Sequence, residues 1–268
     1  MKFLKNKSYI VGVLNITPDS FSDGGKYYNN IEVALKRAKE MINDGADIID
    51  IGGESSKPGS EPVSIEEELR RVLPVVERLS KQAGVIISID TYKPEVAEAC
   101  IKAGVKIIND ITGLSNPKMI KIAAKYKTPV IIMHMQGEPK TMQKNPHYDD
   151  VVGDIYKFFK KRIKSAKDAG IKNIILDPGI GFGKTALHNL SILKNLSKFK
   201  KLGCPILVGP SRKSFIGKIT NSNIEERLPG TIAVLVISQI NGASFFRVHD
   251  VLECKKAILM ANAILKAK

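Results

Sequence analysis

The sequence contains no tryptophan, few other aromatic residues and only three cysteines among its 268 residues. Cys100, Cys204 and Cys254 lie far apart and form no CxxC pair, so the common zinc-binding and disulfide patterns are excluded. No apolar run approaches the ~20 residues that span a bilayer. The opening segment, MKFLKNKSYIVGVL, has only a short apolar stretch and no small-residue cleavage site. We therefore expect a cytoplasmic protein with no signal peptide and no membrane partner.

Positive charge is in excess, because 42 Lys and Arg residues stand against 27 Asp and Glu residues, for a net charge of +15. Arginine is scarce, and the lysines are spread along the chain instead of forming one block. A nucleic-acid-binding surface usually combines a basic stripe with interleaved aromatic residues, which this chain lacks. The pattern is more typical of a solvated lysine-rich surface that raises the local concentration of an anionic small-molecule substrate.

Eight short apolar runs, rich in β-branched residues, predict eight buried parallel strands. They cover residues 9–16, 46–52, 85–91, 106–111, 129–135, 173–177, 205–209 and 244–249. Helical patterns occupy the intervals between them. Eight alternations favour a closed (β/α)8 barrel over an open doubly wound sheet. No linker or low-complexity stretch divides the chain, so we expect one domain over residues 1–268.

The last two helical patterns, at 229–241 and 251–267, are unusually apolar. An outer helix of a barrel normally shows one polar face to water. The segments TIAVLVIS and AILMANAIL leave little such face. We therefore predict a homodimer that forms through these two helices.

Polar residues end several of the predicted strands, and the carboxyl ends of parallel strands are where α/β folds bind ligands. Asp90 and Asp177 are placed this way, and Asn109 offers an amide between them. A buried carboxylate is costly unless several donors reach it. Either Asp alone is equally compatible with a helix cap, whereas the pair favours a pocket for a flat, donor-rich heterocycle.

Basic residues follow the seventh and eighth predicted strands, where barrels commonly bind phosphate. Lys213 lies in SRKSF, and Arg247 and His249 lie on one side of the alternating segment FFRVH. These three residues predict a phosphate or diphosphate site, although Lys213 is also compatible with an ordinary surface lysine.

Two other motifs are rejected. DPGIGFGKT (177–185) has the wrong glycine spacing for a Walker A loop, and no GxSxG elbow for a serine nucleophile is present. His134 ends a predicted strand, where a pocket position and a packed core position remain equally open.

Eight strings, one for each predicted strand, resemble those of the dihydropteroate synthase family and occur in the family's order. They are NITPDSFSDGG (15–25), DIGGESSKPG (50–59), SIDTYKPEVA (88–97), INDITG (108–113), HMQG (134–137), LDPGIGFGK (176–184), GPSRKSFIG (209–217) and RVHDV (247–251). The resemblance covers nearly the whole chain.

The resemblance implies a barrel that joins 6-hydroxymethyl-7,8-dihydropterin diphosphate to 4-aminobenzoate, releasing diphosphate and 7,8-dihydropteroate in folate synthesis. It also implies Mg2+ as the cofactor and a dimer. By position, it assigns the pterin to Asp90, Asn109, Asp177 and Lys213 and the diphosphate to Asn15, Arg247 and His249, with Asn15 as the metal ligand. It assigns the aminobenzoate and sulfonamide pocket to Phe21, Ser56, Lys57, Pro58, Phe182 and Ser214, and catalysis to Asp90, Lys213 and Asp23. Phe21 and Asp23 would lie in a loop that closes over the site.

The chemistry of this reaction is compatible with those residues. An arylamine is nearly all neutral at pH 7 and needs no strong base, so breaking the C–O bond to diphosphate is the difficult step. Cationic groups stabilise the leaving charge. We expect a dissociative substitution in which Asp90 stabilises positive charge on the pterin methylene.

One string departs from the family pattern. The family's loop after the second strand usually reads STRPG, whereas residues 55–59 of this chain read SSKPG. Ser56 stands where the family has threonine, and Lys57 stands where it has arginine. Lysine cannot provide the bidentate recognition of an anion that arginine provides. The change is either drift in a lysine-rich chain or a cause of weaker loop closure and a higher KM for aminobenzoate.

The alternative enzyme is a pterin-binding methyltransferase that uses methyltetrahydrofolate and a corrinoid-carrying partner. It would need neither SRKSF with RVHD nor the NITPDSFSDGG segment. A non-catalytic protein that binds pterin or nucleic acid is the alternative outside enzymes, but nearly all the assigned catalytic positions are intact.

Overall fold

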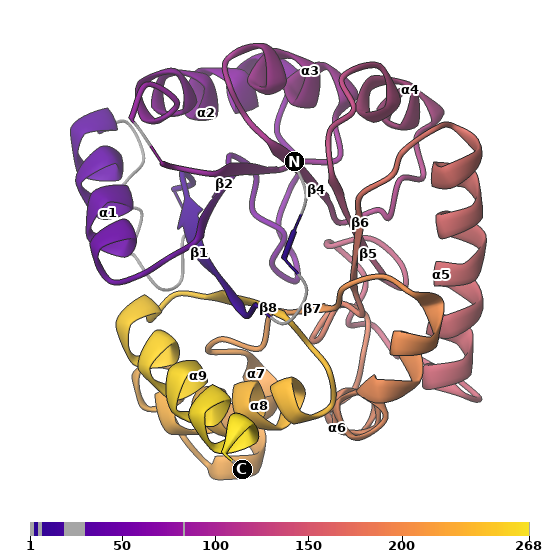
Figure 1. The fold of residues 1–268 in the computed structure, drawn as a ribbon. Coiled ribbons are helices and arrows are strands. Elements are labelled where there is room, and N and C mark those ends of the chain that lie inside the picture. The colour runs from indigo at the N-terminus through magenta and orange to yellow at the C-terminus, as the bar shows by residue number, and fades with distance from the viewer. Residues whose placement is uncertain (1–2, 5–6, 19–29, 83, 268) are drawn as a thin grey trace.

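The computed structural model describes residues 3–4, 7–18, 30–82 and 84–267, which form a ring of parallel strands surrounded by helices (Figure 1). Within these residues the strands are β1 (Tyr9–Asn15), β2 (Ile48–Gly52), β3 (Ile87–Asp90), β4 (Ile107–Asp110), β5 (Val130–Met133), β6 (Ile174–Asp177), β7 (Leu207–Val208) and β8 (Phe245–Val248). Each predicted strand is confirmed, although most are shorter than predicted by one or more residues at either end. The predicted (β/α)8 barrel is therefore confirmed.

The strand order is β6-β5-β4-β3-β2-β1-β8-β7, and every pairing is parallel. The ring closes between β6 and β7 through an isolated bridge from Leu176 to Ile206. The Leu176 amide donates to the Pro205 carbonyl oxygen at 2.9 Å across this seam. The barrel is thus nearly closed, with its least extensive pairing at the β6–β7 seam.

Helices follow the strands in the order that the sequence predicts. They are α1 (Ile31–Asn43), α2 (Ile65–Leu79), α3 (Pro94–Lys102), α4 (Pro117–Lys125), α5 (Val151–Asp168), α6 (Ala186–Lys194), α7 (Ser214–Thr220), α8 (Leu228–Ile240) and α9 (Val251–Lys266), with short 3-10 helices at Leu196–Leu202 and Ile224–Glu226. None of the helices in the described part of the chain is both long and apolar enough to cross a membrane.

The helix boundaries follow local chemistry. The Ser64 hydroxyl caps α2 by accepting from the Glu67 amide at 3.2 Å, and Pro94 occupies the first turn of α3. Gly45 follows α1 with φ of +99°, a conformation that glycine adopts without steric cost. Residues 214–220 form α7, a helix that the helical patterns of the sequence do not indicate. This helix has only seven residues, too few for a periodic apolar pattern to be visible in the sequence.

Two apolar layers hold the barrel together. The larger one packs the outward side chains of the strands against the helices, as in the contacts around Ile10, Ile49 and Phe159. The smaller one fills the barrel interior with Tyr9, Val11, Ile48, Ile107, Ile131, Ile175, Leu207 and Phe245. Because side chains alternate along a strand, positions two residues beyond these interior residues also point inward.

This alternation determines which polar residues reach the barrel mouth. Asp50 lies two residues after Ile48, Asn109 two after Ile107, and Asp177 two after Ile175. Arg247 stands in the same relation to Phe245. The interior is therefore apolar at its base and carries carboxylates, an amide and a guanidinium at the carboxyl ends of its strands.

Candidate active site

The centre of the barrel mouth is a hydrogen-bonded cluster of four side chains from four strands. Asp90 and Asn109 are register partners on β3 and β4. The Arg247 guanidinium reaches across from β8, donating from Nε to Asp50 Oδ2 at 2.6 Å and from Nη2 to Asp90 Oδ2 at 2.7 Å. Asn109 Nδ2 donates to the same Asp50 oxygen at 3.0 Å. Asp90 and Asn109, two of the predicted pterin residues, therefore lie together beside Arg247.

Two oxygen atoms of this cluster are buried and have no hydrogen-bond partner among the described residues. They are Asn109 Oδ1 and Asp50 Oδ1, and both side chains are almost fully buried. Buried polar atoms in proteins are nearly always paired, so unpaired ones need a reason. Two unfilled acceptors at the mouth of a barrel are what a site for an N–H-bearing ligand presents before the ligand binds.

Burial also changes the charge balance of the cluster. It raises the pKa of Asp90 to about 7, with the attraction of Arg247 opposing the shift and the repulsion of Asp50 adding to it. The Asp90 carboxyl therefore changes charge near neutral pH, whereas an ordinary aspartate would be fully ionised there.

A second group of site residues lies on the β6 side of the mouth. The Lys213 ammonium lies 4.5 Å from the centre of the Phe182 ring and donates to the Ile180 carbonyl oxygen. Burial lowers the pKa of Lys213 to about 8, and Asp177 acts in the opposite direction. Asp177 Oδ1 accepts from the Gly179 amide at 2.8 Å, and burial raises the pKa of its carboxyl. Asp177, Phe182 and Lys213 thus form one edge of the mouth.

Gly181 makes the approach of Lys213 possible. An added Cβ there would lie 2.9 Å from Lys213 Cδ, and Gly181 has φ of +84°. Both the position and the backbone conformation favour glycine, which explains the glycine between Ile180 and Phe182 in physical terms.

His249 lies beside this cluster but does not carry a positive charge. Burial and the neighbouring Arg247 lower its pKa to about 3, so the imidazole is neutral at pH 7. Its Nδ1 lies 3.0 Å from the Ser211 hydroxyl. In the site without ligand, His249 of the predicted diphosphate group is therefore a hydrogen-bonding ring and not a cation. The loop that carries Lys213 is joined to the end of β8 by Arg212, whose Nε donates to Asp250 at 3.0 Å.

Asn15 lies at the end of β1, opposite Gly52 of β2 in the strand register. An added Cβ on Gly52 would lie 3.4 Å from Asn15 Oδ1 and 3.6 Å from Asp90 Cβ. The glycine therefore leaves space between these two side chains. Among the described residues, no group of three or more His, Cys, Asp and Glu side chains could hold a metal ion.

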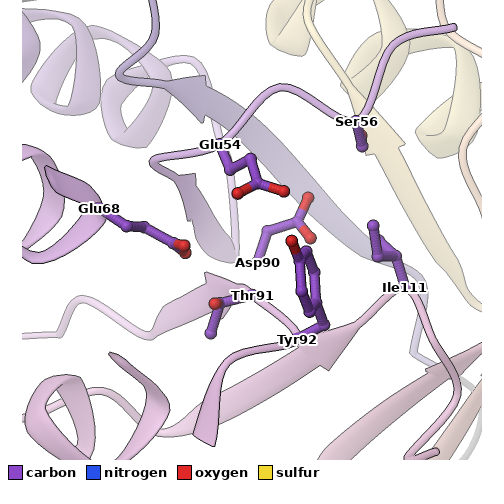
Figure 2. A pocket seen from close by; sticks show the side chains of 7 residues that line it. All are labelled: Glu54, Ser56, Glu68, Asp90, Thr91, Tyr92 and Ile111. Atoms are coloured by element: carbon purple, nitrogen blue, oxygen red, sulfur yellow. The ribbon is translucent and has the colours of Figure 1, made fainter. Parts of the chain in front are cut away.

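A small recess adjoins Asp90 on the side of the second long loop, residues 53–64, which joins β2 to α2 (Figure 2). It is lined by Glu54, Ser56, Glu68, Asp90, Thr91, Tyr92 and Ile111. Figure 2 shows the Glu54 and Asp90 carboxylates and the Tyr92 hydroxyl turned toward the same space. Ser56, a predicted aminobenzoate residue, is therefore brought next to Asp90, a predicted pterin residue.

The base of this loop is fixed by a buried ion-pair cluster that the sequence did not predict. Glu54 Oε2 accepts from Lys93 Nζ at 2.6 Å and from the Val63 amide at 2.9 Å, which joins the two ends of the loop. Lys93 Nζ also donates to Glu68 Oε2 at 2.5 Å. The two ion pairs of Lys93 join residues 39 and 25 positions apart in the chain, so no local pattern indicates them.

The remaining predicted residues are placed less centrally. Lys57 is half-buried and Pro58 is exposed in the same loop, and Ser214 is exposed at the start of α7. Phe21 and Asp23 lie outside the described residues.

His134 has a packed position. It is almost fully buried, and its Nδ1 lies 3.1 Å from the buried Lys184 ammonium. Lys184 also donates to the carbonyl oxygens of His134 and Phe182, at 3.2 and 2.8 Å. Of the two positions left open from the sequence, the structure supports packing, and Lys184 joins the ends of β5 and β6.

Asp50 is the main site residue that the sequence reasoning missed. It lies inside the predicted strand 46–52, two residues before the end of β2, and not at a strand end as Asp177 does. The sequence could have indicated Asp50, because it lies two residues after Ile48 and so points to the same face of the strand. An inward-facing carboxylate near a strand end needs hydrogen-bond donors.

The architecture is that of a barrel enzyme with a polar, anion-attracting mouth, and comparison with known proteins narrows the class. The model of the family described as pterin binding enzyme matches residues 11–249. The dihydropteroate synthase of Escherichia coli K12 is 50% identical over 262 residues, which cover 97% of this chain and 93% of that protein. The chain therefore belongs to the pterin-binding enzymes and, within them, to the dihydropteroate synthase family.

Solved structures agree with this membership. The Yersinia pestis dihydropteroate synthase, solved in complex with a sulfonamide drug, has a TM-score of 0.94 and 46% identity, covering 97% of this chain and 95% of that one. The Xanthomonas albilineans enzyme in complex with 7,8-dihydropteroate has a TM-score of 0.87 and 39% identity, covering 98% and 95%. These relatives support a synthase, which is a transferase, and not the alternative methyltransferase.

Proposed function

We propose that the barrel mouth binds the pterin ring of 6-hydroxymethyl-7,8-dihydropterin diphosphate through Asp90, Asn109, Asp177 and Lys213. The observation that carries this proposal is the pair of buried, unpartnered acceptors on Asn109 and Asp50 beside the Asp90 carboxylate. A pterin presents several N–H donors along one edge, and carboxylates and an amide oxygen accept them. A related enzyme has been solved in complex with 7,8-dihydropteroate, which supports a pterin as the ligand.

The reaction joins the pterin methylene to the amine of 4-aminobenzoate. The C–O bond to diphosphate breaks with its electron pair on oxygen, the C–N bond forms, and the amine loses a proton to water. Asp90, when ionised, stabilises positive charge that develops on the methylene. Lys213 completes the catalytic set by holding the far edge of the ring, and Asp23, outside the described residues, is the third catalytic candidate.

Arg247 and His249 would bind the diphosphate. Arg247 supplies positive charge, and the His249 ring supplies a hydrogen bond.

A magnesium ion fits the donors that are present. Mg2+ prefers oxygen ligands and takes only one or two from protein when substrate phosphates and water supply the rest. Asn15 Oδ1 is such an oxygen, and Gly52 leaves the space beside it open. We therefore assign Asn15 as the protein ligand. When bound, the ion would neutralise charge on the leaving diphosphate.

The aminobenzoate pocket would lie between the second loop and the Lys213 edge. We assign it to Phe21, Ser56, Lys57, Pro58, Phe182 and Ser214. Ser56 borders the recess beside Asp90, and Phe182 contacts Lys213. The relative solved with a sulfonamide drug supports the assignment of this pocket as the sulfonamide site as well.

We also propose that the protein forms a homodimer through α8 and α9, which lie side by side on the outside of the barrel (Figure 1). Large apolar side chains on these helices are half exposed or more: Ile237, Ile240, Leu259, Met260, Ile264 and Leu265. A contiguous apolar patch of this kind usually marks an interface. We further propose that residues 1–268 form one domain and that the protein functions in the cytoplasm.

The direct test compares the complete reaction with three controls, each of which leaves out one component. The protein is incubated with the pterin diphosphate, 4-aminobenzoate and Mg2+, and diphosphate release is measured. We expect release only when all three are present, together with formation of 7,8-dihydropteroate. Release that does not require 4-aminobenzoate would show hydrolysis and contradict the proposed transfer. An Asp90→Asn protein that folds normally and keeps near-full turnover would contradict the role of Asp90.

A further inference from the structure

Asp50 controls which end of the Asn109 carboxamide faces the ligand. Asp50 Oδ2 accepts from Arg247 Nε at 2.6 Å and from Asn109 Nδ2 at 3.0 Å. A carboxylate oxygen that already accepts from a guanidinium would repel a second oxygen at this distance. A carboxamide carries one acceptor oxygen and one donor NH2 group, so only the NH2 group can face Asp50. The orientation of the Asn109 carboxamide therefore follows from its neighbours.

The consequence lies at the other end of the amide. Asn109 Oδ1 is turned away from Asp50, and it is buried without a partner. Asn109 itself is only 4% exposed, so the oxygen has little access to bulk water. A buried acceptor in this state favours ligand groups that carry an N–H and penalises ligand groups that present a lone pair.

We propose that Asp50 is a specificity-determining positioning residue: by fixing Asn109 as an acceptor, it makes this part of the pocket select ring edges that carry N–H donors. Asp50 orients Asn109 through Oδ2, which accepts from both Arg247 and Asn109. Its Oδ1 is a second buried acceptor of the same site, so the orientation of Asn109 is measured separately from ligand affinity. The inference rests on the proposed function, because it requires the pterin ring to bind beside Asn109.

The test compares the affinities of two ligands that differ by one N–H donor group. 6-Hydroxymethylpterin carries a 2-amino donor, and its 2-deamino analogue lacks that donor. Dissociation constants for both are measured by calorimetry on the wild-type protein and on Asp50→Asn. An asparagine at position 50 can donate as well as accept, so it no longer forbids the flipped Asn109 amide. Because any general weakening affects both ligands, the ratio of the two constants isolates the selectivity.

We expect the wild-type protein to prefer the 2-amino ligand by at least about tenfold and Asp50→Asn to reduce that preference to about threefold or less. Ser88→Ala is the matched control, because Ser88 is the register partner of Asp50 on β3 and is equally buried. Its ratio should stay at the wild-type value. An unchanged ratio in Asp50→Asn, or an equal fall in Ser88→Ala, would overturn the proposal.

A measurement on the wild-type protein keeps the proposal testable if Asp50→Asn does not fold. Nuclear Overhauser contacts from the Asn109 Nδ2 protons should reach the Arg247 Nε proton, both without ligand and with 6-hydroxymethylpterin bound. Contacts from those protons to the bound ring instead would overturn the proposal. If the wild-type protein bound neither ligand, or if neither perturbed Asn109, the proposed pterin site itself would be wrong, which is a separate outcome.

Discussion

The raised pKa of Asp90 predicts that pterin binding weakens steeply in mildly acidic solution. The ionised carboxylate accepts N–H donors more strongly than the neutral acid does, and burial raises its pKa to about 7. Because the pKa of this acid is raised, the binding form is lost as pH falls through 7. An aspartate with an ordinary pKa near 4 would stay ionised over the same range and give a flat profile.

The magnitude follows from the ionised fraction of one group. With a pKa of about 7, affinity should fall about fivefold from pH 7 to pH 6 and about tenfold more from pH 6 to pH 5. The last step corresponds to about 1.4 kcal/mol of binding free energy. The measurement is the dissociation constant of 6-hydroxymethylpterin, which has no diphosphate group that titrates in this range.

Two variants separate Asp90 from other groups. Asp90→Asn should bind weakly but with no dependence on pH over this range. Arg247→Gln should move the midpoint above pH 7, because attraction to Arg247 lowers the pKa of Asp90. Lys184, whose pKa burial lowers to about 7, is the competing titrating group. A wild-type profile that is flat, or an Asp90→Asn profile with the wild-type slope, would refute the assignment to Asp90.

Three further predictions concern other parts of the molecule. Gly181→Ala should lower kcat/KM at least about tenfold, because the added methyl group would displace the Lys213 side chain. The control is Gly170→Ala, where φ is also positive but the space around the glycine is open. This control should cost only about 1–2 kcal/mol of stability. Lys57→Arg should leave KM and kcat for aminobenzoate unchanged, and a clear fall in KM would show that this lysine weakens loop closure. Met260→Lys on α9 should give a monomer by light scattering at micromolar concentration, while Leu187→Lys on α6, which is also exposed, should not. A wild-type monomer would reject the dimer outright.

The fold was predictable because its signals are local. Eight β-branched runs and the helical patterns between them are visible in the sequence, and the alternation around Phe245 indicated that Arg247 points into the barrel. The strands were predicted too long because apolar loop residues beside them, such as Ala46 and Val85, read like strand residues. The seven-residue α7 was missed because so short a helix has no periodicity to detect.

The site was predictable in position but not in its pairing. Asp90 and Asn109 were expected together, since they end neighbouring strands. The bonds from Arg247 to Asp50 and Asp90 span 197 and 157 residues, and no sequence pattern encodes such distances. The neutral state of His249 was also inaccessible, because it depends on burial and on the neighbouring guanidinium in three dimensions.

The β6–β7 seam has a consequence for motion. β7 contributes only two residues, and its bridge to β6 lies directly below the segments that carry Phe182 and Lys213. Few backbone bonds must break there for the wall of the barrel to part, so amide protons at Leu176 and Leu207 should exchange with solvent sooner than those of β1 or β2. A ligand that joins Asp177 to Lys213 would tie the two sides of that seam and slow the exchange. The bound substrate would then stabilise the part of the barrel wall that has the fewest backbone hydrogen bonds.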